Sequence, residues 1–207
     1  MFTAVTTTTH ILSPTRSTKL FFVVYFHFTK MATDRIKVLA RIRPLLNKEI
    51  QRGDVIITEV TDENTKIRLE SRSSCGISRN YKLDAILSEN DTQSDVFSHV
   101  QPLLGDLLEG FNCSLFTYGQ TGTGKTHTML GYDLWSMAQQ TNGDEVKALD
   151  SKYPEISRDE EHMGIIPRAM LKLFEFIQAN GNQIDFHVYV SYIEIYNEKI
   201  CDLEYWW

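Results

Sequence analysis

A glycine-rich segment is the part of this sequence whose residue types and spacing could do chemistry. It covers residues 119–126 and matches the pattern G-x-x-x-x-G-K-S/T in full. Glycines let backbone N–H groups approach phosphate oxygens without an intervening Cβ, and the N-terminus of a following helix favours an anion. Lys125 adds an ammonium for the β- and γ-phosphates, and Thr126 adds a hydroxyl for Mg²⁺. The pattern therefore predicts a nucleoside triphosphate site made of Gly119, Gln120, Thr121, Gly122, Thr123, Gly124, Lys125 and Thr126.

The neighbouring segments predict the elements that hold this loop. Residues 114–118 form a compact apolar run, which indicates a strand directly before the glycines, and a helical pattern starts after them. Strand-like segments also occur at 36–42, 55–60, 66–69, 81–87 and 186–196. Helical periodicity covers 92–110, with Thr92 and Asp95 placed as a capping box, and returns from Pro167 onward. This alternation predicts an α/β layered fold with a central, mostly parallel or mixed sheet between helices.

The composition places the chain among globular proteins and argues against several functional classes. It has 207 residues, of which 42% are hydrophobic and 23% are charged, close to the globular average. With 21 Lys and Arg against 27 Asp and Glu, the formal charge of −6 argues against nucleic acid as a partner. The three cysteines form no CxxC pair, so neither a zinc site nor a disulfide framework is expected, and a reducing cytosol fits best. The polar, acidic segment 131–162 is expected to be a surface loop.

The first thirty residues differ from the rest. Residues 1–30 hold three bases and no acid, and they include the apolar run LFFVVYFHF at 20–28. That run is shorter than the roughly 20 apolar residues that cross a bilayer, and no small-x-small cleavage pattern follows it, so no membrane partner is expected. We expect residues 1–30 to be an extension outside the domain, with translation properly beginning at Met31. A targeting or secretory segment is the alternative interpretation.

The residues around the glycine loop are more specific than the general pattern. Four segments carry the resemblance: RIRP at 41–44, LEGFN at 108–112 followed by FTYGQTGTGKTHTM at 116–129, GIIPR at 164–168, and SYIEIYNEKICDL at 191–203. In this order they resemble the motor domain of the kinesin family. The resemblance implies the phosphate-loop NTPase fold of that family in an incomplete form. It assigns residues 31–203 to the N-terminal part of the motor domain and leaves 204–207 as an atypical tail.

The resemblance also implies ligands and roles. In kinesins the R-x-R-P element lines the adenine side of the pocket, so Arg41, Arg43 and Pro44 are expected to flank the base, with His127 stacking near it. Guanidinium planes and an imidazole pack well on a π-face. The family further implies ATP and Mg²⁺ as ligands, with Thr126 on the metal. It implies microtubules as partner, and the cytoplasm and cytoskeleton as location.

The resemblance covers only the front of a motor domain. Kinesins carry their γ-phosphate sensors further along, in N-x-x-S-S-R-S-H and D-L-A-G-S-E segments, and neither occurs in this sequence. We therefore expect this chain to hold the ATP-binding part of a microtubule-stimulated ATPase, to contain no catalytic residues and to hydrolyse ATP near background. The main microtubule-binding elements are expected outside it. The strands that flank 114–118 in the family would also be missing, so both edges of that strand are expected to be unpaired.

Two other functions stay open on the sequence. A truncated isoform without motor activity would act, if at all, by occupying partners. An unrelated phosphate-loop kinase or ATPase would share only the glycine pattern at 119–126 with this chain.

Overall fold

The computed structural model describes residues 2–6, 20–27, 36–61, 64–70, 78–131, 160–182 and 184–202. The chain divides into two compact units, Met1–Ala169 and Met170–Trp207. Within the described ranges, no helix combines the length and apolar character needed to cross a membrane.

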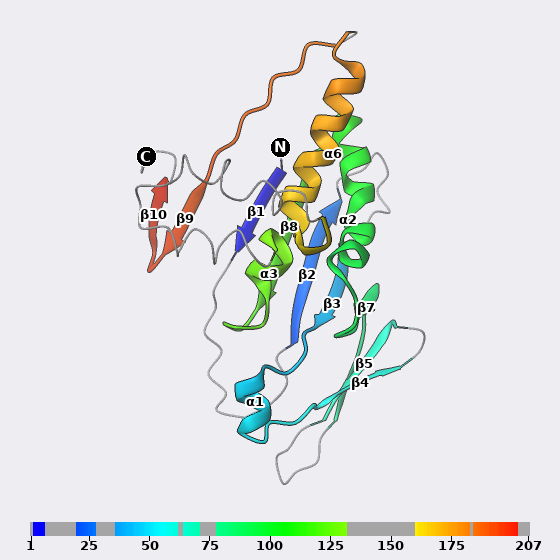
Figure 1. Ribbon diagram of the computed structural model, residues 1–207, viewed down its shortest axis with the longest axis vertical. Coiled ribbons are helices and arrows are strands. Elements are labelled where there is room, and N and C mark those ends of the chain that lie inside the picture. The colour runs from blue at the N-terminus through cyan, green and yellow to red at the C-terminus, as the bar shows by residue number, and fades with distance from the viewer. Residues whose placement is uncertain are drawn as a thin grey trace. The chain divides into compact units, whose positions relative to one another are not determined.

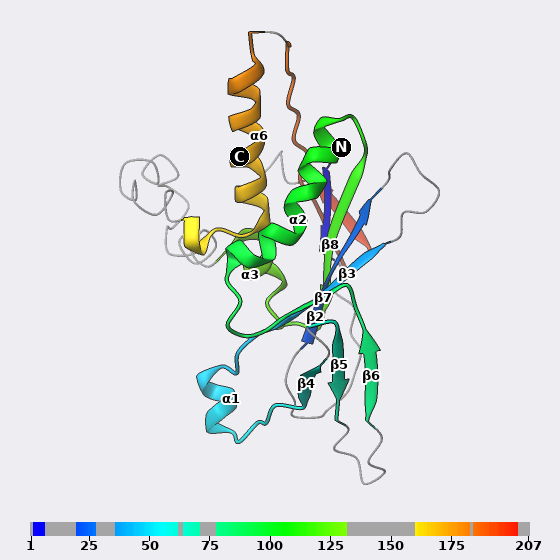
Figure 2. The ribbon, with the colours of Figure 1, turned by 90° about the vertical axis from the view of Figure 1, so that its right-hand side faces the viewer.

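The first unit is built on a mixed five-stranded sheet. Its strand order is β1, β8, β2, β3, β7, and Figures 1 and 2 show these strands side by side. The strands are β1 (Phe2–Thr6), β2 (Leu20–His27), β3 (Lys37–Ile42), β7 (Ala85–Leu87) and β8 (Cys113–Gly119). The β1–β8 and β3–β7 pairs are parallel, whereas β2 runs antiparallel to both β8 and β3. The predicted α/β fold with a mixed sheet is confirmed.

The expectation that both edges of the strand at 114–118 are unpaired is wrong. The backbone of β1 pairs with one edge of β8, and that of β2 pairs with the other and bridges to β3. The physical reason lies in the apolar run at 20–28, whose β-branched and aromatic residues have high strand propensity. The segment 1–30, which we set apart from the domain, thus supplies two strands of this sheet; the boundary at residue 31 stays a prediction.

Two helices and a layer of apolar side chains cover one face of the sheet. They are α2 (Gln93–Leu108) and α3 (Lys125–Leu130), which Figure 2 shows on the same side. The Thr92 hydroxyl accepts the Asp95 amide and the Asp95 carboxylate accepts the Thr92 amide, so the predicted capping box is confirmed. The core beneath contains Leu39, Leu87, Val96, Phe97, Val100, Leu103, Leu104, Cys113, Leu115, Met129, Ile165 and Ala169.

A smaller sheet packs on the opposite face. It consists of β4 (Thr58–Thr61), β5 (Lys66–Leu69) and β6 (Arg79–Lys82), in the order β4, β5, β6 and antiparallel throughout. The predicted hairpin at 55–60 and 66–69 is therefore confirmed, and the segment 81–87 is divided between β6 and β7. A second cluster joins the two sheets through Ala40, Ile42, Ile67 and Ile86. Alternation along β3 thus turns Leu39 and Arg41 toward the helices and Ala40 and Ile42 away from them.

The two ends of the long polar segment meet. Gly131 forms an antiparallel bridge with Met163, and the Gly164 amide donates to the Leu130 carbonyl at 3.2 Å. A short 3₁₀ helix, η3 (Glu160–His162), precedes this contact, and α6 (Ile165–Asn180) begins directly after it, two residues before the predicted start at Pro167. Of the predicted loop at 131–162, residues 132–159 lie outside the described part.

The second unit contains a β-hairpin made of β9 (Ile193–Tyr196) and β10 (Lys199–Asp202). Its two-residue turn has positive φ at Asn197 and Glu198, 48° and 62°, as the turns that match strand twist require. Only residues 193–196 of the predicted strand at 186–196 belong to a described ladder, because the last described residue of β10, Asp202, already pairs with Ile193.

Candidate nucleotide-binding site

The glycine-rich segment lies in the predicted strand–loop–helix setting. Strand β8 ends at Gly119, residues 120–124 form turns and bends, and α3 begins at Lys125. Two of the glycines are required by backbone conformation, since φ is +79° at Gly122 and +104° at Gly124, a region that side chains with a Cβ rarely adopt. The loop therefore has the turned backbone that a phosphate cradle needs.

Lys125 is folded back onto its own loop. Its Nζ donates to the Gly119 carbonyl at 2.9 Å and to the Gln120 carbonyl at 3.0 Å, and the residue is buried. Burial lowers the pKa of Lys125, because the charged ammonium loses hydration. Neutral carbonyl oxygens are weaker hydrogen-bond acceptors than charged phosphate oxygens. The Lys125 ammonium can therefore exchange these carbonyls for phosphate oxygens that enter the loop.

The rest of the loop is divided between buried and exposed side chains. Thr123 is fully buried, and its hydroxyl donates to the Gln120 carbonyl at 2.8 Å, while its amide donates to the same carbonyl at 3.3 Å. These bonds close the turn between the two residues. Thr121, Gly122 and Thr126 are exposed. The Thr126 side chain lies in the first turn of α3, where it suits a metal that also binds phosphate.

Arg43 connects the end of β3 to the loop. Its Nε donates to the Gly122 carbonyl at 2.8 Å, and its two terminal nitrogens donate to the two carboxylate oxygens of Glu49, each at 2.7 Å. The neighbouring Pro44 is exposed. These two residues therefore lie beside the phosphate loop.

Arg41 lies deeper than Arg43. It is buried on the helix side of β3 and donates to Gln93 Oε1 at 2.8 Å and Thr128 Oγ1 at 2.9 Å. Gln93 in turn donates to the His127 carbonyl at 2.6 Å. Burial lowers the pKa of Arg41, with the nearby Asp91 carboxylate acting in the opposite direction. The network joins β3, the start of α2 and the middle of α3.

Sequence reasoning missed Gln93 and Glu49. Gln93 directly follows the predicted cap at Thr92, and a polar residue at that position normally faces solvent. Glu49 lies three residues after Leu46, which is the spacing of an N-terminal capping acid, and its carboxylate accepts the Leu46 amide at 2.9 Å. That spacing was the available signal for Glu49.

His127 is an exposed residue of α3, and its pKa lies below the ordinary value of 6.5. The causes are loss of hydration first, then the positive charge of Arg41 and the proximity of His162. Because the folded state disfavours protonation, the unfolded chain takes up the proton first as pH falls. This contribution to stability is therefore full above about pH 6.5 and is lost as pH falls through the folded pKa.

A pH series tests this assignment. We expect His127→Gln to lose less thermal stability than the unchanged chain when pH is lowered from about 7.5 to about 5.5. The measurement is Tm at each pH for both proteins. Equal slopes for the two chains would contradict the assignment.

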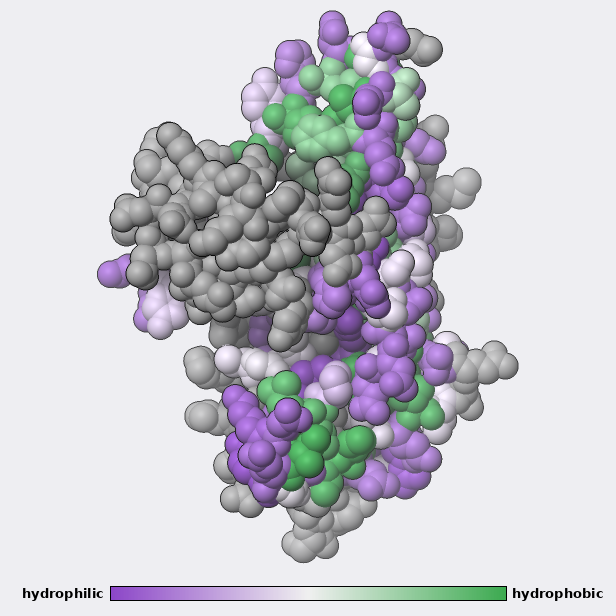
Figure 3. Space-filling model, in the orientation of Figure 1, coloured by the Kyte–Doolittle hydropathy of each residue, from purple (hydrophilic) through white to green (hydrophobic). Residues whose placement is uncertain are grey.

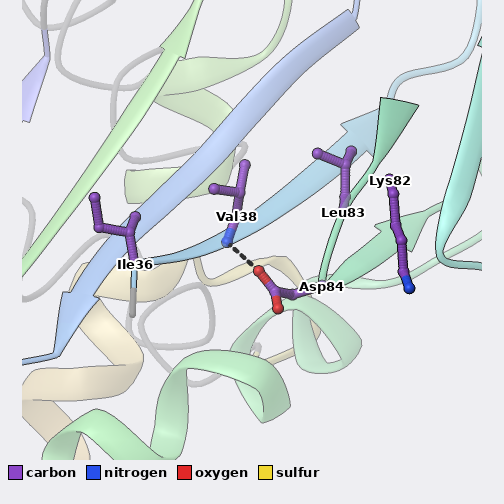
Figure 4. Close-up of a pocket in the computed structure, with 5 residues that line it drawn as sticks. All are labelled: Ile36, Val38, Lys82, Leu83 and Asp84. Carbon is purple, nitrogen blue, oxygen red and sulfur yellow. Dashed lines mark hydrogen bonds between the residues drawn. The ribbon is translucent and has the colours of Figure 1, made fainter. Parts of the chain in front are cut away.

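A separate groove lies near the start of β3. It has a volume of about 470 Å³ and is lined by Ile36, Val38, Lys82, Leu83 and Asp84 (Figure 4). The carboxylate that lines the groove, that of Asp84, already accepts a hydrogen bond from the Val38 amide, with 2.8 Å between Oδ2 and the amide nitrogen. Lys82 lines this groove, but none of its lining residues is a glycine, and for this reason we place the candidate site at residues 119–126. Groups of three or more potential metal ligands of the His, Cys, Asp and Glu type are absent from the described ranges.

Comparisons with known proteins agree with the local geometry. The chain is 34% identical over 174 residues to a kinesin heavy chain of Syncephalastrum racemosum, which covers 84% of this chain and 16% of that protein. It is 34% identical over 178 residues to the kinesin-like protein Klp61F of Drosophila melanogaster, with 84% and 15% covered. It is 36% identical over 169 residues to kinesin heavy chain isoform 5C of Rattus norvegicus, with 81% and 14% covered.

A solved structure and a family model extend the comparison. The structure, described as that of a fast kinesin with implications for ATPase mechanism and interactions with microtubules, matches with a TM-score of 0.60 and 28% identity. The match covers 80% of this chain and 39% of that one. The chain spans about one sixth of the length of the curated relatives named above. The kinesin motor domain model matches residues 41–204. This match decides against an unrelated phosphate-loop protein, and the chain belongs to the kinesin motor domain family.

Proposed function

We propose that residues 31–203 are the ATP-binding part of a kinesin-like microtubule motor and that residues 119–126 hold the triphosphate. The observation that carries this proposal is the buried Lys125 ammonium, held on the carbonyls of Gly119 and Gln120 inside a strand–loop–helix turn. Family membership supports ATP as the nucleotide. In this proposal the ammonium exchanges two neutral carbonyls for charged phosphate oxygens, which are stronger acceptors.

The base is proposed to bind on the side of Arg43, Pro44 and His127. Pro44 and His127 are exposed residues, and Arg43 is fixed beside the loop by its bond to Gly122. Arg41 was expected to flank the base as well, but it is buried and donates to Gln93 and Thr128. We therefore propose that Arg41 supports the adenine side indirectly, because Thr128 directly follows His127 on α3. An apolar ring and an imidazole suit the two faces of adenine.

Mg²⁺ is proposed to bind through Thr126. Thr126 is exposed in the first turn of α3, and its hydroxyl oxygen is the kind of ligand that would suit Mg²⁺ there. When bound, the ion supplies positive charge at the β- and γ-phosphates. The chain's own contribution is to orient the phosphates by the glycine turn and Lys125.

The complete protein is proposed to hydrolyse ATP and to move along or remodel microtubules in the cytoplasm. Catalysis would rest on positioning and charge stabilisation. Because the two sensor segments of the family do not occur in this sequence, the 207-residue chain is proposed to bind nucleotide weakly and to hydrolyse it near background. The second candidate function for the 207-residue chain, a non-enzymatic isoform without motor activity, is compatible with the same proposal. A microtubule-stimulated ATPase assay tests this limit, and robust stimulation would overturn it.

Equilibrium titration with a fluorescent ATP analogue tests nucleotide binding itself. We expect saturable binding that weakens by roughly tenfold when Mg²⁺ is removed with EDTA, because the phosphate charge is then no longer compensated by the metal ion. Unlabelled ATP should displace the analogue. Equal signals with and without the protein, under both conditions, would reject the proposed function.

A further inference from the structure

Helix α1 (Asn47–Gln51) buries a charge and exposes its apolar residues. The Glu49 residue is only 4% exposed, whereas Ile50 is 58% and the preceding Leu46 is 43% exposed. Figure 3 shows the hydrophobic side chains that gather on the surface over this part of the chain. An amphipathic surface helix normally turns its apolar side inward. The inverted arrangement means that the carboxylate of Glu49, rather than apolar packing, fixes this helix.

The buried carboxylate has a specific partner. Its two oxygens accept hydrogen bonds from the two terminal nitrogens of Arg43, each at 2.7 Å. The side chain of Glu49 is 5% exposed and that of Arg43 is 12% exposed. A bidentate arginine–carboxylate pair constrains the guanidinium plane as well as its position. The Leu46 amide and the Pro44 carbonyl bind the same pair, at 2.9 and 2.7 Å. The guanidinium therefore has a single supported orientation.

That orientation directs the Nε–H group of Arg43 at the phosphate loop. Arg43 Nε donates to the Gly122 carbonyl at 2.8 Å. In a planar trans peptide the carbonyl of one residue and the N–H of the next point in opposite directions. Holding the Gly122 carbonyl toward Arg43 thus turns the Thr123 amide back into the loop, where it meets the Gln120 carbonyl at 3.3 Å. Because Gly122 has φ of +79° and no Cβ, its peptide would otherwise rotate easily.

We propose that Glu49 is a positioning residue for nucleotide binding, which acts through Arg43 to hold the Gly122–Thr123 peptide in the orientation that phosphate needs. The residue touches no reacting atom. Its effect on affinity rests on the proposed function, whereas its effect on the order of the loop does not. Both effects are measurable in the full 207-residue chain.

The experiment compares Glu49→Gln with the unchanged chain and with a matched control, Glu59→Gln. Glu59 is also an acid paired with an arginine, Arg68, but at 3.8 Å and with both side chains about half exposed. Hydrogen exchange by mass spectrometry reports on the peptide that spans 119–125, without any nucleotide. We expect Glu49→Gln to speed exchange there by roughly tenfold, because one charged hydrogen-bond acceptor is lost. The control should leave it unchanged.

Affinity for the fluorescent ATP analogue with Mg²⁺ is the second reading. Glu49→Gln should weaken it by roughly tenfold, while Glu59→Gln does not. Glu49→Asp keeps the charge and should restore part of both effects, which a purely structural role at α1 would not require. If exchange accelerates only at α1 and the loop is unaffected, the inference is overturned. If exchange at 119–125 accelerates in Glu49→Gln as expected, but the unchanged chain binds no nucleotide, only the proposed function is rejected.

If Glu49→Gln fails to fold, Arg43→Lys gives the same test. Lysine keeps the charge but cannot bind Glu49 and Gly122 together. Faster exchange at 119–125 is again expected, and an unchanged loop would overturn the inference.

Discussion

Replacing Lys125 by alanine is expected to weaken binding of an ATP analogue by roughly 10- to 100-fold, the cost of one lost hydrogen bond between charged groups. In the free protein the ammonium donates hydrogen bonds to the carbonyls of Gly119 and Gln120. The charged phosphates would be its stronger partners, so the loss should appear mainly in the bound state. Equilibrium titration with Mg²⁺ present measures the change.

Two further variants separate charge from packing. Lys125→Met keeps most of the buried stem and should weaken binding as much as alanine does, while it preserves thermal stability better. Lys172→Ala removes an exposed lysine that pairs with Glu175 on α6, and it should leave affinity unchanged. Wild-type affinity in both Lys125 variants would show that the loop does not bind phosphate through this residue.

Gly164→Ala is expected to destabilise the first unit by about 3 kcal/mol. A Cβ at this position would lie 2.6 Å from the Gly131 amide nitrogen and 2.6 Å from the carbonyl carbon and oxygen of Met129. All three are backbone atoms, so no side-chain rotation relieves the clash. The bridge between Gly131 and Met163 must then open. Urea unfolding followed by circular dichroism measures the loss.

Gly105→Ala is the matched control. This glycine lies inside α2, and a Cβ there meets nothing within 4 Å. Alanine should therefore stabilise the helix by roughly 0.5–1 kcal/mol, because it restricts the unfolded chain. Opposite signs for the two substitutions are the expected result. A Gly164→Ala protein as stable as the unchanged chain would show that the ends of the long polar segment are not pinned here.

Local features could be predicted from the sequence with good detail. The strand before the glycines, the helix after them and the capping box at Thr92 each depend on residues a few positions apart. The same holds for the hairpin of β4 and β5. In all of these, the interacting groups are close in sequence, so the pattern itself contains the contact.

Long-range contacts could not be predicted in this way. The short segment of α1 around Glu49 has the composition of an exposed turn. Glu49 is nevertheless buried, because it pairs with Arg43, and Arg43 also binds Gly122, which lies 79 residues after Arg43 in the sequence. The pairing of β8 with β1 and β2 also depends on chain topology, which alternation does not specify. Arg41 is turned into the core by the side of β3 it occupies, and residue type alone gives no such direction.

We propose that the backbone between Gly119 and Thr126 holds the phosphates of a magnesium nucleotide. The most direct test is a titration of the ¹⁵N-labelled chain with Mg-ATP, followed by amide chemical shifts. We expect the largest shifts at residues 119–126, with smaller ones at Arg43 and His127. Shifts confined to the groove of Val38 and Asp84, or none in the glycine loop at saturating nucleotide, would contradict it.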